Sequence, residues 1–300
     1  MVEPRFEADA GTPEARRALH EQNRLSWNAA TRAHNSHKGD QAKFYREGGN
    51  ELYPEEAALL GDLTGKSVVH LQCNSGQDTL SMRGLGAETL LGIDISDEAI
   101  SFARRLSADS GIEASFVRAD VYDWLASAAA GAERWDVVYC SYGVVTWLSD
   151  LATWARGIAA VLKPGGRFVT VEYHPIVMMF DEEFRHDMPY STRGRPITWD
   201  DGVSDYVAAS GPVVTPSGWV DGVQGFRNPQ PSHEFHWATS EVITALLDTG
   251  LALEHFGEYD YCNGLRPYRE MKDLGTRRWT VPDGKPGIPF MYSLVARKPG

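Results

Sequence analysis

Residues 67–81 read Ser-Val-Val-His-Leu-Gln-Cys-Asn-Ser-Gly-Gln-Asp-Thr-Leu-Ser, and this stretch decides the fold. Its apolar run at residues 68–71 passes into a short polar turn that contains Gly76, and helix-forming residues follow from Gln77. This order predicts a strand, a tight turn and the beginning of a helix.

The next apolar run, Leu-Leu-Gly-Ile-Asp-Ile-Ser at residues 90–96, predicts a second strand that ends at Asp94. In a strand-helix-strand nucleotide site, an acidic residue about 20 positions beyond the turn accepts hydrogen bonds from ribose hydroxyls. Asp94 has that spacing from Gly76. The pair therefore predicts a ligand that contains ribose.

The alternation continues beyond this unit. Apolar strands predicted at 114–117, 135–140 and 167–172 are separated by amphipathic helices. Such alternation indicates a parallel sheet that helices cover on both faces, a doubly wound α/β fold. A final apolar segment at 289–297 is predicted to pair antiparallel inside this sheet.

Four parts of the chain are predicted. Residues 1–60 form an N-terminal helical lid that includes an irregular segment at 33–50, although a helix packed on the outside of the sheet is the alternative. Residues 61–176 form the cofactor-binding core. Residues 177–237, rich in glycine, proline and aromatics without periodicity, form an inserted substrate cap. Residues 238–300 complete the core sheet.

The composition excludes several classes of partner. The 300-residue chain has 29 basic and 41 acidic residues, and its net charge of −12 argues against nucleic acid, which clustered Lys and Arg bind. Its three cysteines predict neither a disulfide framework nor a zinc site. Neither a signal peptide nor a membrane span is recognisable in the sequence, so we expect a cytoplasmic protein. The sequence is compatible with a homodimer.

The turn after the first strand also narrows the ligand. A dinucleotide site requires Gly-x-Gly-x-x-Gly, whereas residues 72–76 contain a single glycine. No complete Gly-x-x-x-x-Gly-Lys-Ser/Thr motif predicts a phosphate loop either. A ligand with ribose but without phosphate fits better.

Five segments, 68–80, 92–96, 117–123, 135–148 and 162–175, together resemble the motifs of class I S-adenosylmethionine-dependent methyltransferases. They are most similar to a bacterial small-molecule subgroup whose first motif reads His-Leu-Gln-Cys. The resemblance implies a seven-stranded Rossmann-like sheet and S-adenosylmethionine as cofactor. It implies cofactor contacts from Gln72, Cys73, Asn74, Gly76, Asp94, Ile95, Asp120, Val121 and Ser141. The chain departs from the family where His70 replaces an acidic residue and where Gln72 and Asn74 replace glycines.

Candidates for the methyl acceptor site cluster in three places. Residues 141–147 follow the fourth strand and lack the Asn/Asp-Pro-Pro-Tyr/Phe of nucleic-acid amino-methyltransferases, and Glu172-Tyr173-His174 follow the fifth. The third cluster combines cap aromatics with Tyr53 of the lid. We predict acceptor contacts from Tyr53, Tyr142, Trp147, Tyr173, His174 and His236, with Tyr53 and His174 as catalytic residues.

These observations predict S-adenosylmethionine-dependent methylation of a small, aromatic acceptor in secondary metabolism, with no metal required. The subgroup resemblance favours carbon methylation of an electron-rich acceptor such as indole C3. O- or N-methylation of an aromatic metabolite is the nearest alternative. A non-catalytic cofactor-binding regulatory protein, or an oxidoreductase on a related sheet, would be a different class.

Overall fold

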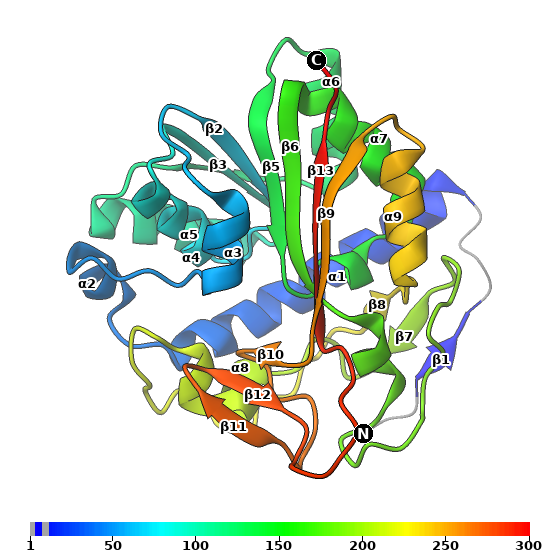
Figure 1. Ribbon diagram of the computed structural model, residues 1–300. Helices are drawn as coiled ribbons and strands as arrows, with labels where there is room; N and C mark the ends of the chain where they lie inside the picture. The colour runs from blue at the N-terminus through cyan, green and yellow to red at the C-terminus, as the bar shows by residue number, and fades with distance from the viewer. Residues whose placement is uncertain (1–3, 8–11) are drawn as a thin grey trace.

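The computed structural model describes residues 4–7 and 12–300 and is built around one seven-stranded sheet (Figure 1). Its strand order is β4-β3-β2-β5-β6-β13-β9. The strands are β2 (Ser67–Leu71), β3 (Thr89–Asp94), β4 (Ser115–Arg118), β5 (Trp135–Ser141), β6 (Leu162–Tyr173), β9 (Ala252–Tyr259) and β13 (Met291–Arg297). The first five are parallel, whereas β13 is antiparallel to both β6 and β9, as predicted for the last strand.

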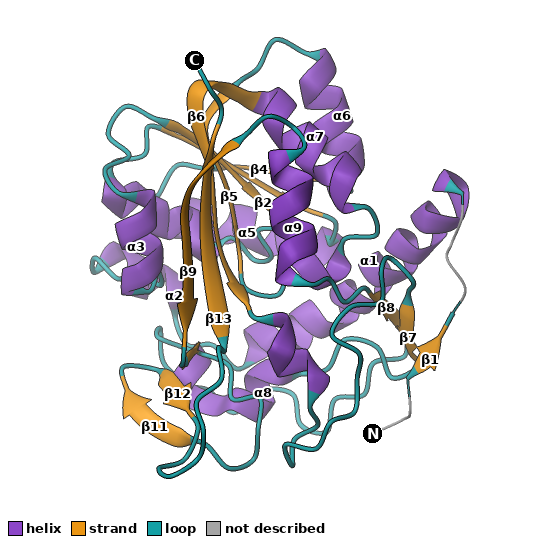
Figure 2. Ribbon diagram, turned by 45° about the vertical axis from the view of Figure 1, so that its right-hand side comes forward, coloured by secondary structure: helices purple, strands orange, loops and turns teal. Residues whose placement is uncertain are grey.

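Helices cover both faces of this sheet (Figure 2). One face packs against α6 (Val121–Ala130), α7 (Leu151–Val161) and α9 (Thr239–Leu247). The other packs against α2 (Gln41–Arg46), α3 (Pro54–Leu60), α4 (Gln77–Ser81) and α5 (Asp97–Ser110), with the 3-10 turn η1 (Met82–Leu85). The predicted doubly wound fold is confirmed.

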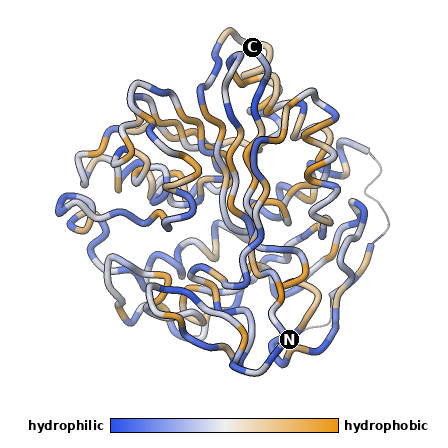
Figure 3. Tube along the Cα trace, viewed as in Figure 1, coloured by the Kyte–Doolittle hydropathy of each residue, from blue (hydrophilic) through white to orange (hydrophobic). Residues whose placement is uncertain are grey.

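The alternation of side chains along each strand explains the two cores. Val68 of β2 contacts the α3 side, whereas Val69 contacts the side of α6 and α7. In β5, likewise, Val137 contacts the α3 side and Val138 contacts the side of α6 and α7. Because both faces are buried, the central strands are almost continuously apolar, which Figure 3 shows as orange along them.

A second layer lies beyond the carboxyl ends of the parallel strands, in the lower half of Figure 1. It contains α8 (Tyr206–Ser210), the 3-10 turns η3 (Pro175–Met179) and η4 (Gly211–Val214), and two three-stranded sheets. One sheet joins β1 (Arg5–Phe6), β7 (Ile197–Trp199) and β8 (Ser232–Glu234). The other joins β10 (Cys262–Asn263), β12 (Arg278–Thr280) and β11 (Lys272–Gly275). The second sheet corrects the expectation that residues 238–300 only complete the core.

The helix α1 (Pro13–Ser36) runs along the boundary between the two layers. Thr12 caps it, with Pro13 in its first turn, as the sequence predicts. The helix continues to Ser36 and α2 begins at Gln41, so most of the segment predicted to be irregular at 33–50 is helical.

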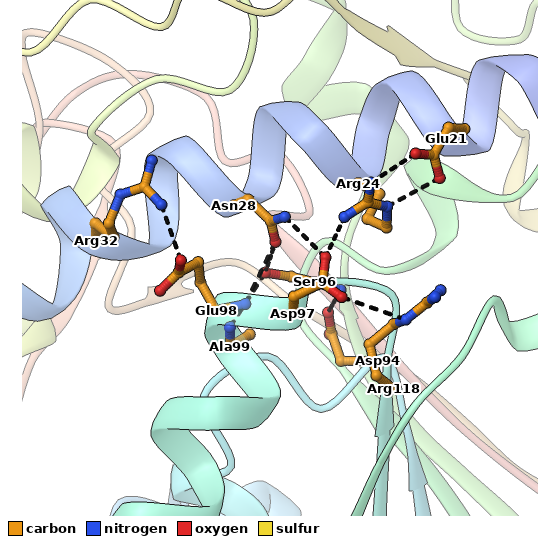
Figure 4. A network of polar contacts seen from close by, with 10 residues as sticks. All are labelled: Glu21, Arg24, Asn28, Arg32, Asp94, Ser96, Asp97, Glu98, Ala99 and Arg118. Carbon is orange, nitrogen blue, oxygen red and sulfur yellow. Dashed lines mark hydrogen bonds and ion pairs between the residues drawn. The ribbon is translucent and has the colours of Figure 1, made fainter.

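Polar contacts hold α1 to both layers. Asn23 pairs with the backbone of His233, donating to its carbonyl at 2.8 Å and accepting from its N–H at 2.7 Å. Figure 4 shows α1 above the start of α5, where Asn28 accepts from Ser96 Oγ at 2.7 Å and donates to Asp97 at 2.9 Å. Arg24 also pairs with Asp97 there.

Within residues 4–7 and 12–300, none of the helices has the length and apolar character needed to cross a lipid bilayer.

Candidate functional site

A cavity of about 660 Å³ lies at the carboxyl edge of the sheet, where β2, β3, β5 and β6 end. The volume is in the range of small-molecule sites. The predicted site residues that line it are Gln72, Cys73, Asn74, Asp94, Ile95, Asp120, Val121, Ser141, Tyr142, Trp147, Tyr173 and His236. The structure thus brings together most of the predicted side chains, whereas Gly76, Tyr53 and His174 do not line this cavity.

The turn after β2 has a backbone that usually needs glycine. Gln72 and Asn74 have φ angles of 54° and 48°, in the left-handed region, at the positions where the family has glycines. Asn74 Oδ1 accepts a hydrogen bond from the N–H of Ser75 at 2.7 Å, a local bond that favours this conformation. Gln72 Nε2 donates to the carbonyl of Val144 at 3.0 Å. The turn therefore keeps the glycine-like path while adding polar side chains to the cavity wall.

Gly76 has a packing role in this structure. Its φ is 81°, and a Cβ there would lie 2.7 Å from a ring carbon of Phe116 and 2.8 Å from Cβ of Ala103. Both distances are too short for a side chain. A cofactor contact from Gly76 stays a prediction.

Asp94 lies at the end of β3 and faces the cavity. Its carboxylate accepts the N–H of Asn74 and the N–H of Ser96, both at 2.8 Å. Burial raises the pKa of Asp94 to about 6 in spite of these bonds. The carboxylate therefore fixes the turn after β2 and the start of α5, and also offers acceptor oxygens to a ligand.

Asp120 caps α6 and lies beside His20, a partner that no local sequence pattern predicts. Its Oδ1 accepts the N–H of Tyr122 at 2.8 Å, and its Oδ2 lies 2.6 Å from Nδ1 of His20 on α1. Burial raises the pKa of Asp120, but the bonds from His20 and the backbone outweigh it, so the pKa is lowered overall. Nε2 of His20 lies 2.8 Å from Ser149 Oγ. Both ring nitrogens of His20 are therefore engaged.

Charged groups gather on another part of the wall. Lys38, Glu51 and Asp78 all line the cavity, and Asp78 accepts from Ser141 Oγ at 3.2 Å. Burial raises the pKa of Glu51 to about 7, raises that of Asp78 and lowers that of Lys38. Within the described residues, the buried oxygens Oε1 of Glu51 and Oε1 of Gln72 have no hydrogen-bond partner. Two acceptors are thus left for a ligand.

Glu172 at the end of β6 holds the loop that follows β5. It accepts hydrogen bonds from the N–H groups of Gly143, Val144 at 2.8 Å, Val145 at 3.0 Å and Tyr173 at 2.6 Å. Burial raises its pKa, and the four backbone donors oppose that shift. The loop carries Tyr142 and the turn η2 (Val145–Trp147), so Glu172 sets the position of two predicted acceptor contacts.

Aromatic side chains form the wall near the ends of β5 and β6. The rings of Tyr142 and Tyr173 lie 5.5 Å apart, and that of Trp147 meets Trp27 of α1 edge-on at 5.4 Å. Tyr142 donates to Glu56 at 3.1 Å and accepts from Asn263 at 2.9 Å. These bonds tie the aromatic wall to α3 and β10.

Tyr53 lines a smaller neighbouring cavity of about 130 Å³, which shares the wall residues Tyr142 and Tyr173 with the large one. Its ring meets Tyr142 edge-on at 6.0 Å and lies 4.2 Å from the guanidinium carbon of Arg277. Tyr53 therefore lies behind the main cavity.

His174 points away from the cavity. Its Nδ1 accepts the N–H of Ile176 at 3.2 Å, and its Nε2 lies 3.1 Å from Glu258 on β9. His174 follows the end of β6 as the N-cap of η3, and these two contacts direct its ring away from the cavity that Tyr173 and Pro175 line. The prediction of two catalytic residues requires Tyr53 and His174 to face each other across the cavity. In the structure, neither of them lines it.

Sequence reasoning missed Glu234 and Trp199, which also line the cavity. They lie on β8 and β7 within the aperiodic insert, and their indole-to-carboxylate hydrogen bond of 3.0 Å joins two strands that no local pattern pairs. An acidic residue inside a run of aromatics, His-Glu-Phe-His-Trp at 233–237, was the one available signal.

Residues 68–166 match the model of a family described as a methyltransferase domain. The ubiquinone biosynthesis O-methyltransferase of Bordetella pertussis is 33% identical over 122 residues, which are 40% of this chain and 48% of the relative. That of Stutzerimonas stutzeri is 32% identical over 120 residues, 39% of this chain and 50% of the relative. The chain thus spans about half the length of the curated relatives it matches.

Two solved structures share the fold over most of their length. An S-adenosylmethionine dependent methyltransferase from Mesorhizobium loti has a TM-score of 0.50 and 22% identity, with 84% of this chain and 99% of that chain covered. A Listeria monocytogenes protein described as an S-adenosylmethionine dependent methyltransferase has a TM-score of 0.53 and 19% identity, with 82% and 96% covered. Residues 68–166 therefore match a methyltransferase domain, and the chain shares the fold of these two solved S-adenosylmethionine-dependent methyltransferases.

Proposed function

We propose that this protein transfers a methyl group from S-adenosylmethionine to a small aromatic acceptor. The observation that carries the proposal is the single cavity, which joins the polar edge at β2 and β3 to the aromatic wall at β5 and β6. One end suits a nucleoside and the other a flat apolar molecule. A cavity of about 660 Å³ has room for two small ligands side by side.

The residues at the polar end fit the cofactor. Asp94 would accept the ribose hydroxyls, and Asp120 with the apolar Ile95 and Val121 would flank the adenine. The unpartnered Oε1 of Glu51 would suit the methionine ammonium.

At the same end, Lys38 would suit the methionine carboxylate, and Gln72 supplies a second unpartnered oxygen. A zwitterion matches a wall that carries both signs of charge, and S-adenosylmethionine ends in one.

When bound, the cofactor supplies an electrophilic methyl group with its own leaving group. The chain itself has to hold the acceptor in line and exclude water, and positioning of this kind contributes up to about 7–11 kcal/mol. No covalent intermediate on the protein is needed. A base helps where the acceptor must lose a proton.

Aromatic side chains dominate the acceptor end and favour a flat acceptor. They can also stabilise positive charge near the transferred methyl through cation–π contact. They are Trp27, Tyr142, Trp147, Tyr173, Trp199, Tyr206, Phe235, Trp237 and Tyr292.

Two versions of the acceptor chemistry have separate support. O-methylation of an aromatic metabolite is supported by the O-methyltransferase activity named for the curated relatives, which cover two fifths of this chain. Carbon methylation at indole C3 is supported by the resemblance of the first motif to a subgroup with His-Leu-Gln-Cys, residues 70–73. Both release one proton: a hydroxyl acceptor loses its O–H proton, and an indole methylated at C3 loses the proton of its N–H or of C3. Product analysis distinguishes them.

The catalytic roles of Tyr53 and His174 stay predictions. Tyr53 would act on the acceptor through Tyr142, whose ring it meets edge-on and which lines both cavities. His174 would have to turn its ring and give up its bonds to Ile176 and Glu258.

The test of the proposed function is binding followed by product analysis. We expect S-adenosylhomocysteine, but neither NAD nor NADP, to raise the melting temperature, since a ligand at about 100 times its dissociation constant adds about 2.7 kcal/mol. With methyl-labelled cofactor and a panel of phenols and indoles, mass spectrometry should find a labelled product, and its fragmentation should give the methylated atom. Stabilisation by NAD alone would contradict the proposal.

We further propose that residues 1–60 and 177–237 act as a lid and a cap that close over bound ligands. The contacts that α1 makes with the start of α5 are polar, which makes opening at this point less costly than separation of an apolar interface. Limited proteolysis should cut both segments slowly when cofactor and acceptor are bound and faster when they are absent. Equal cleavage rates in all states would indicate a fixed cover.

A further inference from the structure

The segment that leaves β8 places two titratable side chains, Glu234 and His236, in the aromatic wall of the cavity. The sequence predicted His236 only as an acceptor contact and did not predict Glu234. Their geometry supports a more specific role.

A hydrogen bond at Nδ1 fixes the tautomer of His236 and leaves Nε2 as an acceptor. Its side chain is 3% exposed, and its Nδ1 lies 3.2 Å from the carbonyl oxygen of Pro189. A carbonyl can only accept, so Nδ1 carries the proton and Nε2 has a free lone pair. Within the described residues, Nε2 has no hydrogen-bond partner, although it is buried in the wall of a cavity. A buried acceptor without a donor is costly and indicates that a ligand supplies one.

Glu234 lies where it can stabilise a charge on that nitrogen. Its Oε2 is 4.0 Å from His236 Nε2 and accepts from Trp199 Nε1 at 3.0 Å, and its side chain is 17% exposed. Burial lowers the pKa of His236 and raises that of Glu234 to about 7. Slightly above neutral pH, the pair is therefore a neutral imidazole beside a carboxylate.

The backbone around His236 is fixed from two sides. The N–H of Phe235 donates to the carbonyl of Thr146 at 2.7 Å, and Trp237 Nε1 donates to the carbonyl of Leu148 at 2.7 Å. The carbonyl of His236 accepts from the N–H of Thr192 at 2.8 Å. The ring is thus held rigidly, as a proton acceptor must be. His20, by contrast, lines the same cavity with both nitrogens engaged.

We propose that His236 binds the O–H or N–H group of the acceptor through Nε2 and takes its proton during methyl transfer, with Glu234 as a positioning residue. The inference rests on the proposed function and assigns the acceptor class: an aromatic ring that bears a weakly acidic O–H or N–H. The acceptor's X–H bond breaks, its electron pair stays with the acceptor, and the proton forms a new bond to Nε2. The imidazolium that results is stabilised by the Glu234 carboxylate. The electron pair of the acceptor would form the new bond to the methyl group, which S-adenosylmethionine would supply together with its own leaving group.

The experiment uses the full chain, labelled with ¹⁵N-histidine and saturated with S-adenosylhomocysteine. Three probes are titrated in turn: indole, catechol and 4-nitrophenol, whose phenolate is coloured. We expect His236 to show the Nδ1–H tautomer and its Nε2 signal to shift when a probe binds. His233, one residue from Glu234 and bonded to Thr198 instead of facing the cavity, is the internal control and should not shift.

Two substitutions separate binding from proton uptake. His236→Asn keeps a donor for Pro189 but removes the acceptor, and should weaken probe binding by about tenfold, the effect of one hydrogen bond. His236→Gln keeps an acceptor near Nε2 and should bind the probes. In buffer of neutral pH, however, its bound 4-nitrophenol should show a smaller phenolate fraction than that bound to the wild type. Glu234→Gln should lower the phenolate fraction without loss of S-adenosylhomocysteine affinity, a change that a purely structural role would not produce.

The proposal is overturned if His236 carries its proton on Nε2, if no probe shifts its signal, or if bound 4-nitrophenol stays protonated in the wild type. Failure of the proposed function has another signature, because S-adenosylhomocysteine would then not bind the wild-type protein at all.

Discussion

Asp94→Ala should weaken the binding of S-adenosylhomocysteine by about 100-fold or more while the protein stays folded. A hydrogen bond to a charged group contributes roughly 1.5–3 kcal/mol, and a carboxylate that accepts two ribose hydroxyls loses two such bonds. Asp94 also accepts the N–H groups of Asn74 and Ser96, so the turn that borders the cavity loses support as well. Titration calorimetry measures the effect directly.

Asp136→Ala is the matched control for this substitution. Asp136 also accepts a backbone N–H, that of Ser67 at 2.9 Å, and lies at the opposite, amino end of the parallel strands. Asp136→Ala should lower the free energy of unfolding without changing the dissociation constant of S-adenosylhomocysteine. If Asp94→Ala binds S-adenosylhomocysteine as tightly as the wild type, Asp94 is not part of the site and the assignment of the nucleoside end is wrong.

Glu172→Ala should lower the free energy of unfolding by at least about 4 kcal/mol, because hydrogen bonds to a buried carboxylate contribute about 1.5–3 kcal/mol each. Four backbone N–H groups share this carboxylate, and Glu172 is buried, so water does not readily replace it. Urea denaturation followed by circular dichroism gives the value. Because three of the four donors, those of Gly143, Val144 and Val145, lie in the loop after β5, the variant should also lose order in Tyr142 and Trp147.

The control for Glu172 is Glu254→Ala on β9. Glu254 pairs with Arg297 at the surface, where ion pairs contribute between 0 and about 1 kcal/mol. It should change stability little. A loss below about 1 kcal/mol for Glu172→Ala would show that the loop is held by its other contacts, and the role assigned to this carboxylate would fail.

The core of the fold was predictable because its signals are local. The strand and helix that meet at residues 71–77 are adjacent in the chain, and each element carries its own periodicity. Asp94 follows from the same logic, since strand ends of a parallel sheet share one edge. The antiparallel position of β13 followed from an apolar run near residue 290.

The parts of the site that could not be predicted depend on contacts between segments that are distant in the sequence. The pairing of Asp120 with His20 spans 100 residues, and the bond between Trp199 and Glu234 joins two strands inside an aperiodic insert. Neither partner carries a pattern that identifies the other. The placement of His174 also depends on a distant segment, because its contact with Glu258 on β9 directs its ring away from the cavity.

The pairing of Asn23 with His233 has a consequence for how the protein is made. These residues lie 210 positions apart, so α1 leaves the ribosome well before its partner His233 has been synthesised. At typical rates of 5–20 residues per second, the delay is about 10–40 s. An apolar stripe exposed for that time would invite association with other chains. The helix α1 instead contacts the segments synthesised after it through Asn23, Arg24 and Asn28. Water can form hydrogen bonds with these side chains until those segments are in place.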